Sequence, residues 1–462
     1  MEDVLLESYL RQGAFRDYTE LRLQRNVSRS VSFRNGDLVG NRVSEAGGVC
    51  ARVFRGGSCG FAASPMQTDE GIRAVLNSAT ENARFLDSRQ KLGLPPFSPV
   101  AAAQHRDPYV RTAPVPQKQI IDFLRAVDAY VEAHCPKLLC RVTVAPCLDM
   151  EKSLVTSDGV FCHSYHPHSS LYVLLTAEDR DGAPQELGLT LGESGTFDRV
   201  FHRPEDLYEK IDTVYTRLME KCDAVYAEAG YKDVILHPDL AGMLAHEAVG
   251  HTTEADFVLS GSVAGPNKDK QVASELVTLV DFAHTAFGKE CAFPIYIDDE
   301  GTPAEDVTVI DHGILRGYMH NKDSARQLGA KPTGNARAFS FSDEPLIRMR
   351  NTAILPGKDK LEDMIAAVDD GYYFVDTGNG QADATGEFMF GVDCGYEIRH
   401  GKLGRAIKST TISGVAFEML KTVDMLSDDL SWVSCGMCGK KQPMPVSMGG
   451  PAIKCKINVG GR

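Results

Sequence analysis

Residues 237–251 read HPDLAGMLAHEAVGH and carry a helical pattern that ends in an unusual cluster of polar residues. Pro238 stands at a position that tolerates proline, the first turn of a helix. The apolar side chains that follow recur at helical spacing and predict one buried face. This face is formed by Leu240, Met243, Leu244 and Ala248.

The two histidines of this segment, His246 and His251, are five residues apart. In a regular α-helix, residues five apart point about 140° away from each other, at roughly 100° per residue. A π-type bulge absorbs one residue and brings such a pair nearly into line, and these bulges concentrate at functional sites. Gly250 is expected to loosen the turn. The spacing therefore predicts a π-bulge if both histidines bind one metal ion.

Metal chemistry is one interpretation of this cluster, since H-E-x-x-H is a zinc-protease signature and here one residue is added. Glu247 stands where a general base would serve. A catalytic zinc takes three protein ligands, and two candidates exist for the third. Glu254 binds the metal, is solvated or orients a histidine. The other candidate is the segment VSCGMCGKKQPMPVSMGGP (433–451), in which a glycine directly follows Cys435 and another directly follows Cys438. These cysteines also form a CxxC, so a redox pair is a rival interpretation.

The composition is that of a soluble globular protein, with 43% hydrophobic and 24% charged residues. The formal net charge of −14 and the lack of a basic stripe argue against nucleic-acid binding. No apolar run approaches the roughly 18 residues of a membrane helix, and the start of the chain does not resemble a secretory signal. Twelve scattered cysteines suit a reducing compartment. We expect a cytoplasmic protein without a membrane partner.

Patterning along the chain predicts an α+β fold in two domains. Residues 1–230 alternate helices with antiparallel strands, with turns at Asn35-Gly36 and Gly56-Gly57. Residues 231–462 are rich in strands and are expected to form a barrel- or sandwich-like domain that carries the histidine helix. Expected helices are residues 7–14, 68–89 with Thr68 as N-cap, 117–134, 204–230 and a short one near 360–370.

Four further segments, in order, carry a resemblance to a known family. They are LAHEAVGHTTEADF (244–257), IDDEGTPAEDVTVIDHGILRGYMHNKDSARQLGAKPTGNARA (297–338), IRMRNTAILPG (347–357) and CGKKQPMPVSMGGPAIKCKINVGG (438–461). Together they resemble the TldD/PmbA family of metalloproteases, strongly over about residues 230–462 and more weakly in GGVCARVFRGGSCGFAAS (47–64). The H-E-x-x-x-H spacing is the spacing of that family.

The resemblance implies a zinc peptidase of the TldD type. Its zinc ligands would be His246, His251 and Cys438, with Glu247 as the general base. The sequence departs from the family pattern C-G-K-x-G-Q, because Gln442 follows Lys441 directly. A second departure is an alanine at position 336, where the family commonly has glycine. His320, Arg337, Arg348 and Asn351 lie in family-like tracts and either contact substrate or stabilise the fold.

The resemblance also implies extended peptides as substrates, and a homodimer or a heterodimer with a PmbA/TldE-type paralogue that lacks the histidine motif. The alternatives are a subunit that holds a metal without using it and a hydrolase of another amide or ester. A second cluster, CHSYHPH (162–168), offers His163, His166 and His168. Because it sits in a strand-and-turn context, turn or surface packing explains it better than a metal site.

Overall fold

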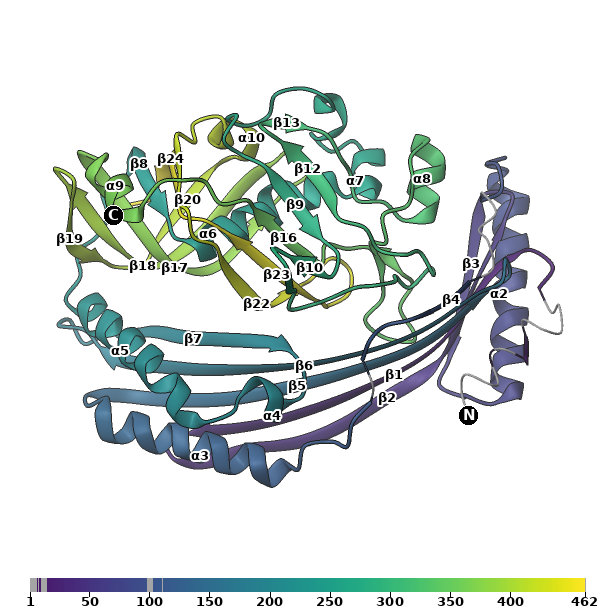
Figure 1. Ribbon diagram of the computed structural model, residues 1–462, viewed down its shortest axis with the longest axis horizontal. Helices are drawn as coiled ribbons and strands as arrows, with labels where there is room; N and C mark the ends of the chain where they lie inside the picture. The colour runs from purple at the N-terminus through teal and green to yellow at the C-terminus, as the bar shows by residue number, and fades with distance from the viewer. Residues whose placement is uncertain (1–5, 7, 10–14, 98–102, 110, 462) are drawn as a thin grey trace.

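A computed structural model describes residues 6, 8–9, 15–97, 103–109 and 111–461 of the chain. Its N-terminal part is a long, curved sheet of order β3-β2-β1-β5-β6-β4, with β7 also paired to β6 (Figure 1). All of these pairs are antiparallel except β4 with β6. The strands are β1 (Tyr18–Arg34), β2 (Asp37–Arg55), β3 (Ser58–Ser64), β4 (Ala103–Arg106), β5 (Leu138–Thr156), β6 (Val160–Glu178) and β7 (Pro184–Ser194).

The two predicted turns join β1 to β2 and β2 to β3. Asn35 and Gly36 have φ angles of 49° and 89°, and Gly56 and Gly57 have φ angles of 56° and 96°. Glycine reaches this left-handed region without steric cost, and asparagine tolerates it better than most residues. The local turn chemistry therefore confirms both turns.

Helices cover the outer face of this sheet (Figure 1). The Thr68 hydroxyl accepts a hydrogen bond from the Gly71 amide and caps α2 (Asp69–Gln90), as predicted. The predicted helix at 117–134 is α3 (Gln117–His134). The helix expected at 204–230 is shorter: it is a 3₁₀ turn (Pro204–Leu207) followed by α5 (Tyr208–Cys222). Most of the expected helix at 7–14 lies outside the described residues.

The end of α5 at Cys222 has a tertiary cause. Val225 leaves the helix to form a parallel bridge with Ile407. Its amide donates to the Ala406 carbonyl, and its own carbonyl accepts from the Lys408 amide. These two hydrogen bonds replace the helical ones, so the prediction of a helix to Gly230 was wrong.

The C-terminal part contains a barrel-like sheet and a second sheet beside it. The first has the order β17-β8-β24-β20-β18-β19, and β17 also pairs with β18, which closes the ring. The second has the order β13-β12-β9-β16-β23-β22. Strands of the first are β8 (Gly230–Leu236), β17 (Asp370–Ala382), β18 (Glu387–Arg399), β19 (Lys402–Ile407), β20 (Thr410–Val415) and β24 (Ile453–Val459); those of the second are β9 (Leu279–Phe282), β12 (Val307–Asp311), β13 (Ile314–Leu315), β16 (Asn351–Ile354), β22 (Ser431–Cys438) and β23 (Met444–Gly450).

The histidine segment lies between these two sheets. It comprises α6 (Pro238–Met243) and a π-helix (Leu244–Gly250), which contact β16 and β23 on one side and β17 on the other. Leu240, Leu244 and Ala248 belong to the large apolar cluster that fills this space. The predicted short helix near 360–370 is α9 (Leu361–Ala366). The α+β fold with a β-rich, barrel-like C-terminal part is confirmed.

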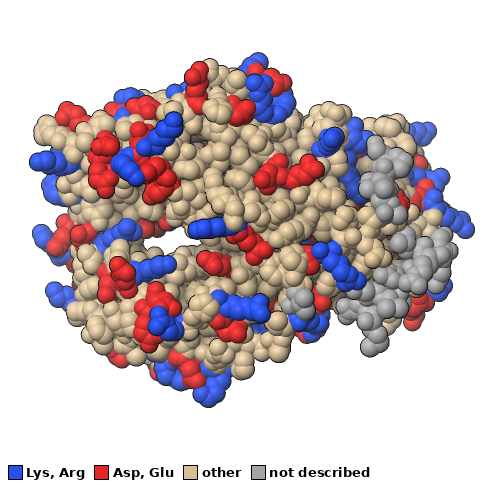
Figure 2. Space-filling model, viewed as in Figure 1, with Lys and Arg blue, Asp and Glu red and all other residues tan. Residues whose placement is uncertain are grey.

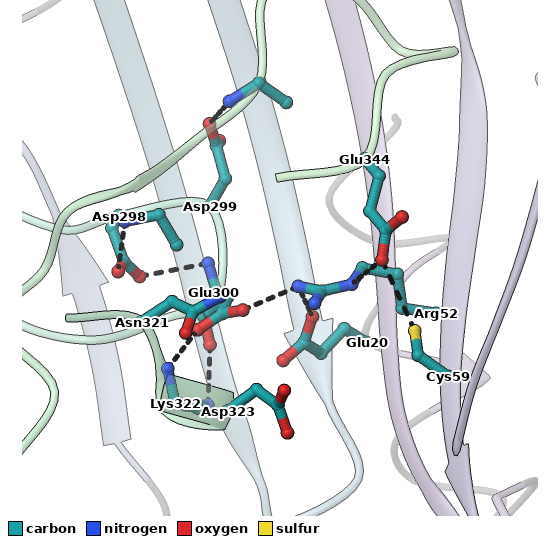
Figure 3. Close-up of polar contacts among 12 residues, drawn as sticks. Glu20, Arg52, Cys59, Asp298, Asp299, Glu300, Asn321, Lys322, Asp323 and Glu344 are labelled. Carbon is teal, nitrogen blue, oxygen red and sulfur yellow. Dashed lines mark hydrogen bonds and ion pairs between the residues drawn. The ribbon is translucent and has the colours of Figure 1, made fainter. Parts of the chain in front are cut away.

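A buried ion-pair network joins the N-terminal sheet to loops of the C-terminal part (Figure 3). Arg52 on β2 pairs with Glu20 on β1 at 3.0 Å and with Glu300 at 2.7 Å. It also contacts Glu344 at 3.4 Å. The Lys322 ammonium donates to the Glu300 carbonyl oxygen. Because the charges of Arg52, Glu20 and Glu300 are removed from water, each of the three depends on its partners, and the network fixes the two parts against each other.

The surface shows no single-signed patch on the face of Figure 2, where basic and acidic side chains are interspersed. On this face an opening lies between the C-terminal part and the N-terminal sheet on the left of the view, and the two parts are in contact to its right. None of the helices in the described part of the chain has the length and apolar character needed to cross a bilayer.

Candidate metal centre

The backbone of the histidine segment is the π-helix that the five-residue spacing predicts. The His251 amide donates to the His246 carbonyl oxygen, an i→i+5 bond that replaces the α-helical pattern. The two imidazoles consequently lie together, with ring centroids 5.1 Å apart. His246 is buried and His251 is partly exposed. The extra residue of the motif is therefore absorbed by the helix itself.

Gly250 is required here by packing and not by its backbone angles. Its φ and ψ are both −54°, which any residue adopts in a helix. A Cβ at this position would lie 2.0 Å from the sulfur of Met349, which is itself buried. The expectation that glycine loosens the turn stays a prediction, and the structure adds that the glycine lets the tract 347–351 approach the histidine helix.

The third corner of the site is Cys438, at the end of β22. Its Sγ lies 3.2 Å from Nε2 of His251. One donor atom each from His246, His251 and Cys438 lie within 4.8 Å of one another. Neither buried ring nitrogen of His246 has a hydrogen-bond partner among the described residues. Two imidazoles and a thiol with unsatisfied buried nitrogens fit a metal such as zinc, which takes sulfur and nitrogen ligands.

The electrostatics of the three residues favour a thiolate. Burial alone would raise the pKa of Cys438, but its interactions with His246 and His251 lower that pKa to about 4. Burial alone would lower the pKa of His251, but Glu254 and Cys438 raise it to about 10. The thiolate is the form of cysteine that binds metals, so the site presents this ligand already ionised.

Glu254, the rival candidate for third ligand, lies on the other side of His251. Its Oε2 is 2.8 Å from Nδ1 of His251 and 3.0 Å from the ammonium of Lys440. A carboxylate on Nδ1 fixes the tautomer of the ring and leaves Nε2 free toward Cys438. The alternative in which Glu254 orients a histidine is therefore the one that the geometry supports.

Glu247 is partly exposed, and its Oε2 lies 3.7 Å from Nε2 of His251. The carboxylate is thus beside the cluster of donor atoms and open to solvent on one side. This position allows it to exchange a proton with a water molecule or substrate next to the cluster.

Two models of one protein family match the chain. A family model described as the PmbA/TldA metallopeptidase C-terminal domain matches residues 229–461, and one described as PmbA/TldA metallopeptidase domain 1 matches residues 19–83. The chain belongs to the TldD/PmbA family of metallopeptidases. It is 32% identical over 458 residues to the metalloprotease TldD homolog of Buchnera aphidicola subsp. Schizaphis graminum, covering 96% of this chain and 93% of that protein.

Other TldD/PmbA relatives agree in fold and sequence. The chain is 33% identical over 295 residues to the zinc metalloprotease TldD homolog of Saccharolobus solfataricus, covering 63% of this chain and 65% of that protein. The structure of TldE from Thermococcus kodakarensis superposes with a TM-score of 0.76 at 16% identity, covering 99% and 100% of the two chains. At this identity the structural likeness concerns the fold alone.

The shortened C-G-K loop departs from the TldD/PmbA pattern and has a local structural consequence. Lys441 has a φ of 57°, in the left-handed region that favours glycine. The Gln442 side chain, which comes next, accepts from the Phe339 amide and donates to the Glu344 carbonyl. The loop therefore keeps its contacts, at the cost of a strained non-glycine residue.

The four residues of the other TldD/PmbA-like tracts are buried and hydrogen-bonded. Arg337 donates to the carbonyls of Met349 and Pro445, and Arg348 donates to the carbonyls of Cys438, Lys440 and Gln442. The Asn351 amide bonds the backbone of Phe282 and Phe293. His320 shares a hydrogen bond with Ser324. These contacts agree with the fold-stabilising interpretation of each residue. The substituted position, Ala336, is buried and its amide donates to Asp298.

The CxxC motif and the histidines of CHSYHPH are arranged differently from the candidate metal centre. Burial raises the pKa of Cys435 to about 12, so the two thiols of the CxxC differ in character. His163 contacts Glu151 on one face of the sheet, whereas His166 and His168 line a cavity of about 40 Å³ on the other face. Among the described residues, His246, His251 and Cys438 are the group of histidine, cysteine or acidic side chains whose donor atoms lie close enough together to bind one metal ion.

The residue that sequence reasoning missed is Lys440. The only signal was its place in the C-G-K motif, two positions after Cys438. Its partners, Glu254 and Asp256, are 186 and 184 positions away, so their meeting was not legible from the sequence.

Proposed function

We propose that this chain is a zinc peptidase that hydrolyses extended peptides. The observation that carries the proposal is the convergence of two imidazoles and one thiolate beside a solvent-accessible carboxylate, Glu247. His246, His251 and Cys438 would hold the ion. A bound zinc ion would supply a Lewis acid for the peptide carbonyl and lower the pKa of a water molecule toward about 7.

In this proposal Glu247 moves the proton. Its carboxylate accepts a proton as a water oxygen adds to the peptide carbonyl carbon, and later donates it to the amine nitrogen when the C–N bond breaks. The Glu254 carboxylate holds the Nδ1 proton of His251 throughout, so that the ring keeps one orientation.

The substrate class follows from the strand that carries the cysteine. β22 is the last strand of its sheet and runs into Cys438, and Met437 beside it is exposed. An extended peptide can add to such an edge through main-chain hydrogen bonds, which accept many sequences. We propose unfolded peptides as substrates, with folded proteins excluded when a partner encloses the site. Cleavage of folded proteins as readily as short peptides would contradict this enclosure.

We also propose an assembly, a domain division and a location for this chain. The likeness to a TldE structure supports pairing with a second copy or with a PmbA/TldE-type paralogue. The large apolar clusters, each drawn almost entirely from one of the two parts, support a domain division near residue 230. The twelve cysteines are free, which supports a reducing, cytoplasmic location.

The experiment that tests the function is substitution of Glu247 by glutamine, which preserves the shape of the side chain. We expect Glu247→Gln to bind as much zinc as the wild type and to cleave peptides about 10²–10⁴-fold more slowly, the usual contribution of a general base. Glu275→Gln, at an exposed position, is the matched control. Unchanged cleavage by Glu247→Gln would remove the mechanism, and cleavage of small amides or esters but not peptides would change the substrate class.

A further inference from the structure

Lys440 closes a ring of contacts around the metal centre. The ring runs from Cys438 through two residues of chain to Lys440, from its ammonium to Glu254, from Glu254 to His251, and from His251 back to the Cys438 sulfur. We infer that Lys440 and Glu254 are positioning residues that couple the cysteine ligand to the His251 ligand, an inference that rests on the proposed metal site.

The ammonium of Lys440 is buried, and each of its hydrogens has an acceptor. It lies 3.0 Å from Oε2 of Glu254, 2.7 Å from Oδ2 of Asp256 and 3.0 Å from the Ile347 carbonyl oxygen. An ammonium has three hydrogens to donate, so these three partners satisfy it. The charge also lies 4.6 Å from the centre of the Phe257 ring. Because all of these contacts hold the Lys440 side chain, the side chain fixes the position of the loop from which it extends.

Glu254 needs this partner because its side chain is completely buried. A buried carboxylate without a positive neighbour is costly, and losing that neighbour leaves an uncompensated charge. Its Oε2 is shared between Lys440 and His251. Lys440 therefore maintains the carboxylate that orients the His251 ring. The same side chain ties the segment that follows the histidine helix to the loop that begins after Cys438.

The backbone of this loop is held by a different residue. The guanidinium of Arg348, which is buried, donates to the carbonyl oxygens of Cys438 at 2.8 Å, Gln442 at 2.8 Å and Lys440 at 3.2 Å. Because these bonds do not involve the Lys440 side chain, the loop should stay folded when that side chain loses its charge. This separation makes the role of Lys440 testable by substitution.

The test measures zinc affinity of the full chain by competition with a chromophoric chelator. We expect Lys440→Met to bind zinc 10–100-fold more weakly than the wild type, the usual effect of removing a group behind a ligand. Lys441→Met, the same change at the exposed neighbour, is the control and should bind as the wild type does. Lys440→Arg keeps the charge and should recover part of the lost affinity.

A double-mutant cycle separates positioning from a general structural effect. Because Lys440 and Glu254 act through one ion pair, Glu254→Gln with Lys440→Met should lose less affinity than the sum of the single losses. With cobalt(II) in place of zinc, the thiolate charge-transfer band should weaken or shift in Lys440→Met and not in Lys441→Met. The melting temperature of each metal-free variant shows that it is folded.

Two results would overturn the inference. One is zinc affinity of Lys440→Met equal to that of the wild type. The other is a strictly additive double mutant with an unchanged cobalt spectrum. Either result leaves the proposed function standing, because that proposal is tested by zinc binding of the wild-type chain and by peptide cleavage by Glu247→Gln, neither of which involves Lys440. Should Lys440→Met not fold, Glu254→Gln takes its place: zinc affinity 10–100-fold below that of the wild type supports the inference, and zinc affinity equal to that of the wild type contradicts it.

Discussion

The sulfur of Cys438 lies 3.2 Å from Nε2 of His251, although 187 positions separate the two residues. The π-helix turns His251 toward the site, and β22 delivers Cys438 to it from the other side. The candidate metal centre is thus a product of tertiary structure, and its geometry depends on how closely the histidine helix and the C-terminal strands pack.

Close packing at Gly250 predicts the effect of adding one methyl group. Gly250→Ala would place a Cβ 2.0 Å from the Met349 sulfur, so that either Met349 or the π-helix must move. We expect a loss of about 1–3 kcal/mol in the free energy of unfolding, the usual range for overpacking. Denaturant unfolding of the metal-free protein measures it.

The matched control is Gly439→Ala, next to Cys438, where a Cβ would meet no atom within 4 Å. This variant should unfold as the wild type does. Equal stability of the two alanine variants would show that the approach of Met349 does not require glycine.

The strained residue of the shortened loop gives a second prediction. Lys441 has a φ of 57°, a region that costs non-glycine residues about 1–2 kcal/mol and is worst for β-branched side chains. Lys441→Gly should leave the protein as stable as the wild type or up to about 1 kcal/mol more stable, and Lys441→Val should be less stable by about 1–2 kcal/mol. A valine variant as stable as the glycine variant would contradict the backbone geometry.

The ion-pair network of Figure 3 predicts a pH dependence of stability. Burial raises the pKa of Glu20 from 4.5 to about 7, against the opposing effect of Arg52. Because the folded state holds this proton more tightly, the contribution of Glu20 to stability falls as pH rises from about 4.5 to about 7, and is constant above. The fall is at most about 3 kcal/mol, from 1.36 kcal/mol per pKa unit.

Comparison with Glu20→Gln isolates this contribution, because the other titrating groups cancel in the difference. The variant should gain stability relative to the wild type between about pH 4.5 and pH 7, as measured by denaturant unfolding at each pH. A difference in unfolding free energy that does not change with pH would show that Glu20 titrates normally.

The features that the sequence predicts correctly depend on local chemistry. The turns at Asn35-Gly36 and Gly56-Gly57, the Thr68 cap and the π-helix each follow from a few neighbouring residues. The end of α5 does not, because Val225 is drawn into a bridge with Ile407, 182 positions away by residue number. The histidines and Glu247 could be selected from their spacing, whereas Cys438 needed the family resemblance.

The role of Lys440 could not be predicted from the sequence. Its motif marks it, but its role depends on a carboxylate, Glu254, that the fold brings to it from a distant segment. The same is true of Gly250, whose need for a small side chain comes from Met349 and not from its own backbone angles. Contacts of this kind are properties of the packed core.

The most direct test of the account is the metal content of four purified proteins: the wild type, His246→Ala, Cys438→Ala and Cys435→Ala, measured by elemental analysis. The account predicts one zinc ion per chain in the wild type and in Cys435→Ala, and loss of zinc in His246→Ala and Cys438→Ala. Zinc retained in full by Cys438→Ala, or lost equally from Cys435→Ala, would contradict it.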